Sequence, residues 1–173
     1  IRDRSNYDGK LVAIDPDTET FQANIEDLER KITPKTKALI INNPNNPTGV
    51  VYSEETIKKV AAILDAKQKE YGTEIFIISD EPYRELAYDG VEVPYITKYY
   101  NNTIVGYSFS KSLSLPGERI GYLVIPDEVD DAEQMKTAAA IATRVLGFVN
   151  APSLMQRAVA RCIDAKCDVD SYN

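Results

Sequence analysis

The stretch SFSKSLSLPGERIGY, residues 108–122, decides the fold of this chain and the chemistry expected of it. The apolar run at residues 104–107 predicts a buried strand, which delivers two serine hydroxyls and the Lys111 amine into a loop. That loop closes on Arg119. A lysine amine that lies beside other cations and is partly desolvated can lose its proton and condense with a carbonyl as a Schiff base. Hydroxyls and a guanidinium hold phosphate, so the stretch suggests a site for a phosphorylated aldehyde.

The composition limits the classes of function. The 173 residues are 43% hydrophobic, which is enough for one domain with a core, and no run of residues predicts a membrane span. Lys and Arg number 20 against 27 Asp and Glu, and the net charge of −7 argues against nucleic acid or an anionic membrane as partner. Histidine is absent, which excludes imidazole proton transfer and histidine-based metal sites. No metal site is predicted.

The two cysteines and the first residues bear on where the protein works. Cys162 and Cys167 lie outside any C-x-x-C spacing, and no signal segment opens the chain, so a cytoplasmic location is expected. The helical spacing of Val159 and Cys162 places Cys162 in the core, whereas Cys167 reads as a tail residue. The chain opens on Ile1, which is not a natural start, and we expect it to be a piece of a longer protein.

The rest of the pattern alternates strands and helices. Apolar runs at residues 38–41 and 75–78 are typical of parallel strands covered on both faces, and residues 11–14 are a shorter strand candidate. Asn24 and Ser53 each precede a helical pattern that they can cap. These elements predict an α/β domain.

Three expectations concern the second half of the chain. Residues 122–125 predict a strand that follows the lysine loop too closely for a parallel crossover, so we expect this strand to be antiparallel. Amphipathic helices are expected around Met135 and around Met155. Ligands of open α/β sheets gather beyond the carboxyl ends of the strands, so the polar residues at those ends should share one crevice. The residues are Asn46, Asp80, Ser108 and Lys111.

Three motifs occur in one order: NPNNPTG at residues 43–49, SDEPY at residues 79–83, and the SFSK stretch followed by Arg119. With these motifs the chain resembles the class I/II aminotransferases, which are fold-type I enzymes that use pyridoxal 5'-phosphate. The resemblance covers essentially the whole chain. It implies a three-layer α/β fold whose sheet is mostly parallel, with helices on both faces and one antiparallel strand. It also implies transamination between an amino acid and a 2-keto acid.

The same resemblance implies that residues 1–173 are part of the large cofactor-binding domain, incomplete at the N-terminus and without the C-terminal small domain. In the family, the parts outside this segment supply further phosphate contacts, the aromatic stacking on the ring and the arginine for the substrate carboxylate. The 173 residues alone are therefore expected to be inactive, and the identity of the substrates lies beyond them. The full-length protein is expected to be a homodimer, with residues 147–153 approaching the neighbouring subunit.

The resemblance gives four residues roles around the cofactor ring. Lys111 would form the Schiff base and move the substrate proton, and Asp80 would pair with the pyridine nitrogen. Asn46 and Tyr83 would bond the phenolic oxygen. Taken singly, each has a plainer interpretation, since an Asn-Pro loop is usually a turn, Asp80 could cap a short helix, and Tyr83 could be a packing residue. Glu81 matches the family pattern without a direct role.

Three residues are expected to hold the phosphate. Ser108 and Arg119 match the phosphate-binding serine and arginine of the family, and Ser110 is a second serine candidate. The alternatives are a strand-end serine, a surface arginine and a turn-forming serine.

Three other functions stay open. Carbon-sulfur lyases share this core, although they often have histidine where this chain has Tyr83. Some transcription regulators have an aminotransferase-like effector domain, which a helix-turn-helix pattern upstream would reveal. The chain could also be a folded segment that binds no ligand, and the absorbance of added pyridoxal phosphate would distinguish that case.

Overall fold

The computed structural model describes residues 9–163 and residue 165. In this part of the chain four strands form one sheet in the order β1-β2-β3-β4, so each strand lies beside the strand that precedes it. They are β1 (Ala38–Asn42), β2 (Phe76–Asp80), β3 (Thr103–Ser108) and β4 (Gly121–Val124). The first three are parallel and β4 is antiparallel to β3, which confirms the predicted mixed sheet.

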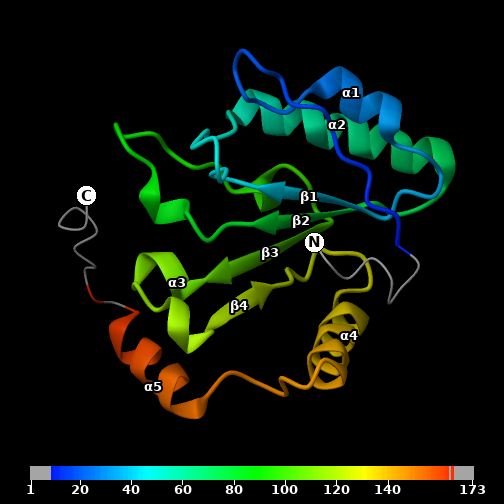
Figure 1. Ribbon diagram of the computed structural model, residues 1–173. Coiled ribbons are helices and arrows are strands. Elements are labelled where there is room, and N and C mark those ends of the chain that lie inside the picture. The colour runs from blue at the N-terminus through cyan, green and yellow to red at the C-terminus, as the bar shows by residue number, and fades with distance from the viewer. Residues whose placement is uncertain (1–8, 164, 166–173) are drawn as a thin grey trace.

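Helices flank the sheet on two sides. Figure 1 shows α1 and α2 on one side of the sheet and α4 and α5 on the other, as expected for a three-layer α/β fold. The described α-helices are α1 (Ile25–Lys31), α2 (Glu54–Tyr71), α3 (Phe109–Ser112), α4 (Ala132–Val145) and α5 (Ser153–Cys162). Short 3-10 turns are η1 (Arg84–Leu86), η2 (Ile96–Lys98) and η3 (Pro116–Glu118).

The two predicted N-caps are confirmed. The Asn24 side chain accepts a hydrogen bond from the backbone of Asp27, and the Ser53 hydroxyl accepts one from the backbone of Thr56. Each bond satisfies one of the amide groups that the first turn of a helix leaves without a partner. Helix α2 then ends at Gly72, whose φ of 63° lies in the left-handed region that glycine adopts without strain.

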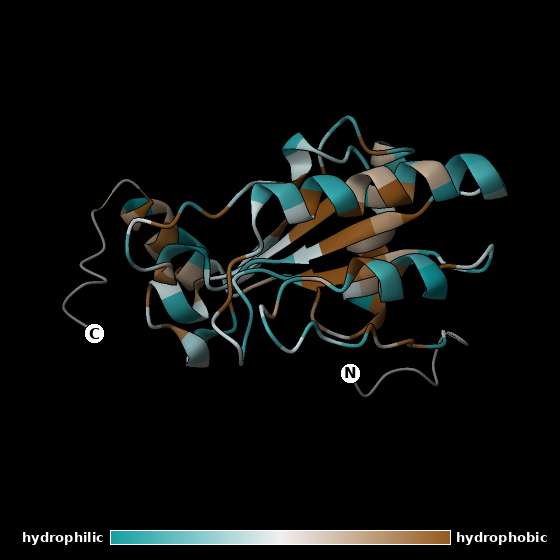
Figure 2. Ribbon diagram, turned by 90° about the horizontal axis from the view of Figure 1, so that it is seen from above, coloured by the Kyte–Doolittle hydropathy of each residue, from teal (hydrophilic) through white to brown (hydrophobic). Residues whose placement is uncertain are grey.

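The main core lies between the sheet and the pair α1 and α2. Figure 2 shows hydrophobic residues along the strands, whereas the helices alternate between hydrophobic and hydrophilic residues. The buried side chains of this core come from α1, α2, β1, β2 and the segments around β2 and η2: Leu28, Ile32, Ile41, Ile57, Val60, Ala61, Leu64, Ile75, Ile77, Ile96 and Tyr100. Burial of such side chains is the main term that stabilises the fold.

The opposite face of the sheet is covered only in part. Successive side chains of a strand point to opposite faces, so Ile40 and Ile78 face away from the core that Ile41 and Ile77 enter. Ile40 is 60% exposed and Ile78 37% exposed. The expectation that these two strands are covered on both faces is therefore wrong for this face.

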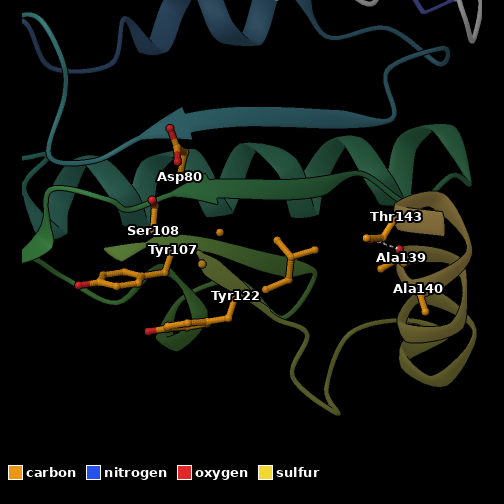
Figure 3. A pocket seen from close by; sticks show the side chains of 10 residues that line it. Asp80, Tyr107, Ser108, Tyr122, Ala139, Ala140 and Thr143 are labelled. Atoms are coloured by element: carbon orange, nitrogen blue, oxygen red, sulfur yellow. Dashed lines mark hydrogen bonds between the residues drawn. The ribbon is translucent and has the colours of Figure 1, made fainter. Parts of the chain in front are cut away.

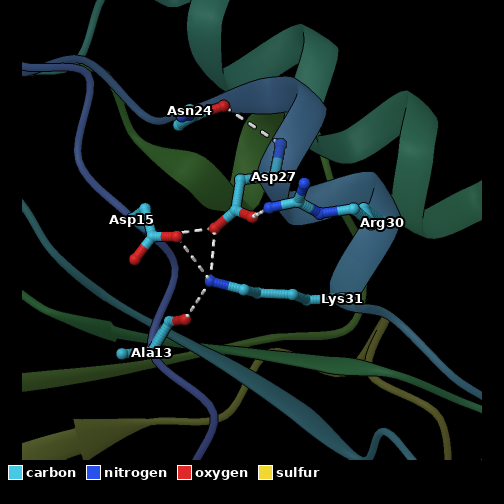
Figure 4. A network of polar contacts seen from close by, with 6 residues as sticks. All are labelled: Ala13, Asp15, Asn24, Asp27, Arg30 and Lys31. Carbon is cyan, nitrogen blue, oxygen red and sulfur yellow. Dashed lines mark hydrogen bonds and ion pairs between the residues drawn. The ribbon is translucent and has the colours of Figure 1, made fainter.

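The predicted strand at residues 11–14 is also wrong, because side chains of α1 bind this segment where a strand would need a neighbouring strand (Figure 4). The Lys31 ammonium donates to the Ala13 carbonyl at 2.8 Å, and the Asp15 amide donates to the Asp27 carboxylate at 2.6 Å. Asp27 is buried, and the bond from Lys31 is the largest of several contacts that lower its pKa to about 2. The segment thus lies along α1 as irregular chain.

The C-terminal helices confirm two predicted elements and correct one residue. Both amphipathic helices form, as α4 and α5. Val159 is buried, but Cys162 is exposed, so the prediction of a core cysteine is wrong. Cys167 lies outside the described residues. Among the helices described, none combines the length and the apolar character that crossing a membrane requires.

Candidate functional site

The strand register gathers the polar residues at one edge of the sheet. Asn42 is in register with Asp80, Asp80 with Gly106, and Ser108 with Gly121. Asn42, Asp80 and Ser108 are the last residues of the three parallel strands, where open α/β sheets bind their ligands. The expected crevice residues therefore start from one edge, on neighbouring strands.

A hydrogen bond joins the loops that follow β1 and β2. The Asn46 amide Nδ2 donates to the Tyr83 hydroxyl at 2.9 Å, although the two residues lie 37 positions apart. The Lys111 Nζ lies 5.4 Å from the centroid of the Tyr83 ring, within the range of a cation–π contact. The structure thus brings Asn46, Tyr83 and Lys111 together, one from each of the three motifs.

The Asp80 carboxylate is held by a residue that we did not predict. Asn42 Nδ2 donates to the Asp80 carboxylate Oδ2 at 3.2 Å and to the Asp80 carbonyl at 3.0 Å. Desolvation raises the pKa of Asp80, and the bond from Asn42 opposes that rise. Asp80 does not cap the short turn η1, which begins after Tyr83 without a side-chain cap. The only sequence signal for Asn42 is its place at the end of an apolar run.

The turn after β2 contains a buried ion pair. Glu81 is 3% exposed, and its two carboxylate oxygens accept bonds from the Ser79 hydroxyl at 2.7 Å and from Arg84 Nε at 2.8 Å. Arg84 also donates to the carbonyls of Val93 and Pro94. Tyr83 lies between Glu81 and Arg84 in the sequence. The Glu81–Arg84 ion pair therefore fixes the turn that contains Tyr83.

Ser108 and Ser110 meet at the start of α3. Ser108 is the N-cap of this short helix, and its hydroxyl accepts a bond from the Ser110 amide at 3.2 Å. The same hydroxyl donates to the Ser110 hydroxyl at 2.7 Å. Lys111 follows directly and is exposed. The two predicted phosphate serines are therefore brought together next to the lysine.

Arg119 forms its hydrogen bond with a residue other than the two serines. It adopts a left-handed conformation with φ of 52° after η3, is exposed, and donates to the Pro116 carbonyl at 2.7 Å. Within residues 9–163, no hydrogen bond joins Arg119 to Ser108 or Ser110. Its assignment to a phosphate stays a prediction.

A cavity of about 510 Å³ begins at the same edge of the sheet. Figure 3 shows Asp80 and Ser108 close to one another at the strand ends, with the α4 residues on the far side of the cavity. Small-molecule sites commonly have volumes in this range. The lining residues are Asp80, Gly106, Tyr107, Ser108, Gly121, Tyr122, Leu123, Ala139, Ala140 and Thr143. Asn46, Tyr83 and Lys111 are not among them, so the cavity reaches only the Asp80 and Ser108 side of the site.

Comparison with known proteins gives a consistent match. The family model described as aminotransferase class I and II matches residues 4–172. A probable aspartate/prephenate aminotransferase of Aquifex aeolicus is 43% identical over 112 residues, which are 62% of this chain and 27% of that protein. The aspartate aminotransferase of Sulfolobus acidocaldarius is 34% identical over 154 residues, covering 86% of this chain and 34% of that protein.

A solved structure agrees with these sequence matches. The crystal structure of an amino transferase from Eubacterium rectale is 55% identical, with a TM-score of 0.90, and the match covers 94% of this chain and 41% of that one. The chain thus spans about a third of the length of the two curated relatives.

Proposed function

We propose a function from the premise that this chain belongs to the aminotransferase class I and II family. The proposal is that it forms the core of the cofactor-binding domain of an enzyme that transfers an amino group between an amino acid and a 2-keto acid. One observation carries it: the Asn46–Tyr83 hydrogen bond, with Lys111 next to the same tyrosine ring, unites the three motifs in one place. The names of the relatives, several of which are aspartate aminotransferases, support this reaction.

In this proposal each group of pyridoxal 5'-phosphate has a chemically matching partner in the chain. Its aldehyde matches the Lys111 amine, and its pyridine nitrogen matches the Asp80 carboxylate. Its phenolic oxygen matches the hydrogen-bonded pair of Asn46 and Tyr83. Its phosphate matches the paired hydroxyls of Ser108 and Ser110, with Arg119 as the cation. When bound, the cofactor accepts the electron pair that remains when the substrate α-proton leaves.

The residues of the chain divide the remaining work. Lys111 Nζ would take the proton from the substrate α-carbon as a general base and return it, as a general acid, to the former aldehyde carbon of the cofactor, two bonds away. Asp80, as an ionised carboxylate, would pair with the ring nitrogen and favour its protonated form. The Tyr83 hydroxyl and the Asn46 side-chain amide would hold the phenolic oxygen and so orient the ring relative to Lys111.

We propose that residues 1–173 are part of the large domain, and that further segments of the enzyme, including a C-terminal small domain, complete the substrate site. The short share of each relative that the chain spans supports this division. We also propose a homodimer, because Val145, Phe148 and Leu154 around the predicted intersubunit segment are each more than 70% exposed. A cytoplasmic location is part of the same proposal.

The test is the absorbance near the edge of the visible range after pyridoxal phosphate is added to the full-length protein. A band is expected in the unmodified protein and not in Lys111→Ala. Lys98→Ala is the matched control, because Lys98 Nζ lies 5.5 Å from the ring of Tyr95 in much the same relation. Amino acid and keto acid are then supplied and keto-acid formation is measured. An unchanged band in Lys111→Ala contradicts the proposal.

A further inference from the structure

Asn42 connects two groups of the candidate site through one side chain. Its Nδ2 donates to the Asp80 carboxylate Oδ2 at 3.2 Å, and its Oδ1 accepts from the backbone N–H of Asn46 at 2.8 Å. Asp80 lies directly opposite in the β1–β2 register, while Asn46 is four residues further along the chain. The Asn42 amide is thus bonded on one side to the predicted partner of the ring nitrogen and on the other to a predicted partner of the phenolic oxygen.

A purely structural role accounts for part of this arrangement. An asparagine at a strand end often bonds nearby backbone groups and so stabilises a turn. The bonds from Asn42 to the Asp80 carbonyl and from the Asn46 amide fit that role. The bond to the Asp80 carboxylate does not, because it holds a side chain that the turn does not need. A hydrogen bond to an ionised group is stronger than a neutral one and fixes its direction.

We infer that Asn42 is a positioning residue, which orients the Asp80 carboxylate toward the cavity and links its position to that of Asn46. The role of Asp80 at the ring nitrogen rests on the proposed function. The hydrogen bonds of Asn42 to Asp80 and Asn46 do not depend on it. The titratable groups that line the cavity with Asp80 are Tyr107 and Tyr122. Burial raises the pKa of both tyrosines, so they stay neutral while Asp80 titrates. Desolvation raises the pKa of Asp80, and the bond from Asn42 is the described polar contact that opposes this rise.

Two variants separate the bonds to Asp80 from the bond to Asn46. Asn42→Leu keeps the approximate size of the side chain and removes all three of its side-chain bonds, those to the Asp80 carboxylate and carbonyl and that from the Asn46 backbone. Asn42→Asp keeps the oxygen that accepts from Asn46 but replaces the donor with a second carboxylate, so it disturbs Asp80 while preserving the loop. The matched control is Asn102→Leu. Asn102 donates to the Asp130 carboxylate at 2.6 Å and accepts from the Asp130 backbone N–H at 2.8 Å, just before β3 begins and away from the carboxyl ends of the strands.

The first measurement needs no cofactor. The Asp80 carboxyl carbon is followed by NMR against pH in the full-length protein without pyridoxal phosphate. Both Asn42 variants are expected to titrate at higher pH than the unmodified protein, because a bond that favours the charged form is gone. Asn102→Leu is expected to leave the titration unchanged. An unchanged titration in Asn42→Leu and in Asn42→Asp overturns the inference.

The second measurement adds pyridoxal phosphate. We expect the dissociation constant to rise about tenfold in Asn42→Leu, the effect of losing one hydrogen bond to a charged group, and the absorbance band to change with pH at a different midpoint. A variant that is merely less stable, with the same dissociation constant and the same midpoint, contradicts a positioning role. If the unmodified protein does not bind pyridoxal phosphate, the proposed function fails, and the NMR titration still decides whether Asn42 holds the Asp80 carboxylate and lowers its pKa.

Discussion

The Asn46 amide and the Tyr83 hydroxyl are 2.9 Å apart, although they belong to loops that follow different strands. The bond depends on the parallel pairing of β1 with β2, since a shift of one residue would move either loop away from the other. It also fixes the direction of both polar groups before any ligand arrives.

Replacing Tyr83 with Phe removes this bond and the phenol expected at the cofactor oxygen. In the full-length enzyme we expect kcat to fall by about tenfold to a hundredfold, the range for a lost hydrogen bond to a charged group. The absorbance maximum of bound pyridoxal phosphate should shift as well. Tyr95→Phe is the control, because it keeps the ring on which the Arg84 guanidinium stacks at 3.9 Å. Equal rates in Tyr83→Phe and the unmodified enzyme would count against the assigned role.

Removing Arg84 leaves the buried Glu81 carboxylate without its cation. We expect Arg84→Ala to lower the free energy of unfolding by about 3 kcal/mol, because breaking one side of a buried pair leaves a charge unpaired. Lys59→Ala breaks an exposed pair with Glu55 and should cost far less, because solvent screens the two charges. Urea unfolding of the three proteins measures both values. Similar losses in the two variants would show that the Glu81 pair is not special.

The lowered pKa of Asp27 predicts that the folded protein loses stability in acid. That pKa is lowered from 3.8 to about 2 in the folded protein, first by the bond from Lys31. A carboxyl group with a lowered folded-state pKa stabilises the fold fully above its unfolded pKa and loses that contribution as the pH falls through the folded value. The unfolding midpoint of the unmodified protein should therefore approach that of Asp27→Asn between about pH 4 and pH 2. A constant difference over that interval would contradict the assignment.

Gly121 is required by the close approach of β3 and β4. A Cβ atom at this position would lie 2.3 Å from the Tyr107 carbonyl oxygen, which is backbone and cannot move aside. We expect Gly121→Ala to lower the free energy of unfolding by about 1–3 kcal/mol or to separate the strands. Gly117→Ala, whose Cβ would meet nothing within 4 Å, serves as the control. Thermal unfolding of the two variants is the measurement. A clash predicts that Gly121→Ala lowers the unfolding temperature much more than Gly117→Ala, and equal changes in the two variants would contradict it.

The sequence predicted most elements because their signals are local. Three apolar runs became β1, β2 and β3, and the caps Asn24 and Ser53 began the two helices expected of them. The prediction of a strand at residues 11–14 was wrong because a strand also needs a neighbouring strand. Lys31 binds the Ala13 carbonyl there instead. The prediction of a buried Cys162 was wrong because periodicity defines the apolar face of a helix but not how much of that face is covered.

The site could be predicted only as far as its motifs extend. Asn46, Tyr83 and Lys111 stood in recognisable motifs, and the structure brings them together. Asn42 stood out by neither motif nor periodicity, because its importance arises from its cross-strand register with Asp80. Contacts of this kind depend on pairing between distant segments, which local patterns do not specify.

The order β1-β2-β3-β4 has a consequence for biosynthesis. Each strand can dock on its predecessor as the ribosome releases it, without waiting for a later segment to insert between two earlier ones. The carboxylate and the amide–phenol pair can therefore be in place before the lysine emerges, so vectorial synthesis builds this part of the binding edge from β1 toward β4.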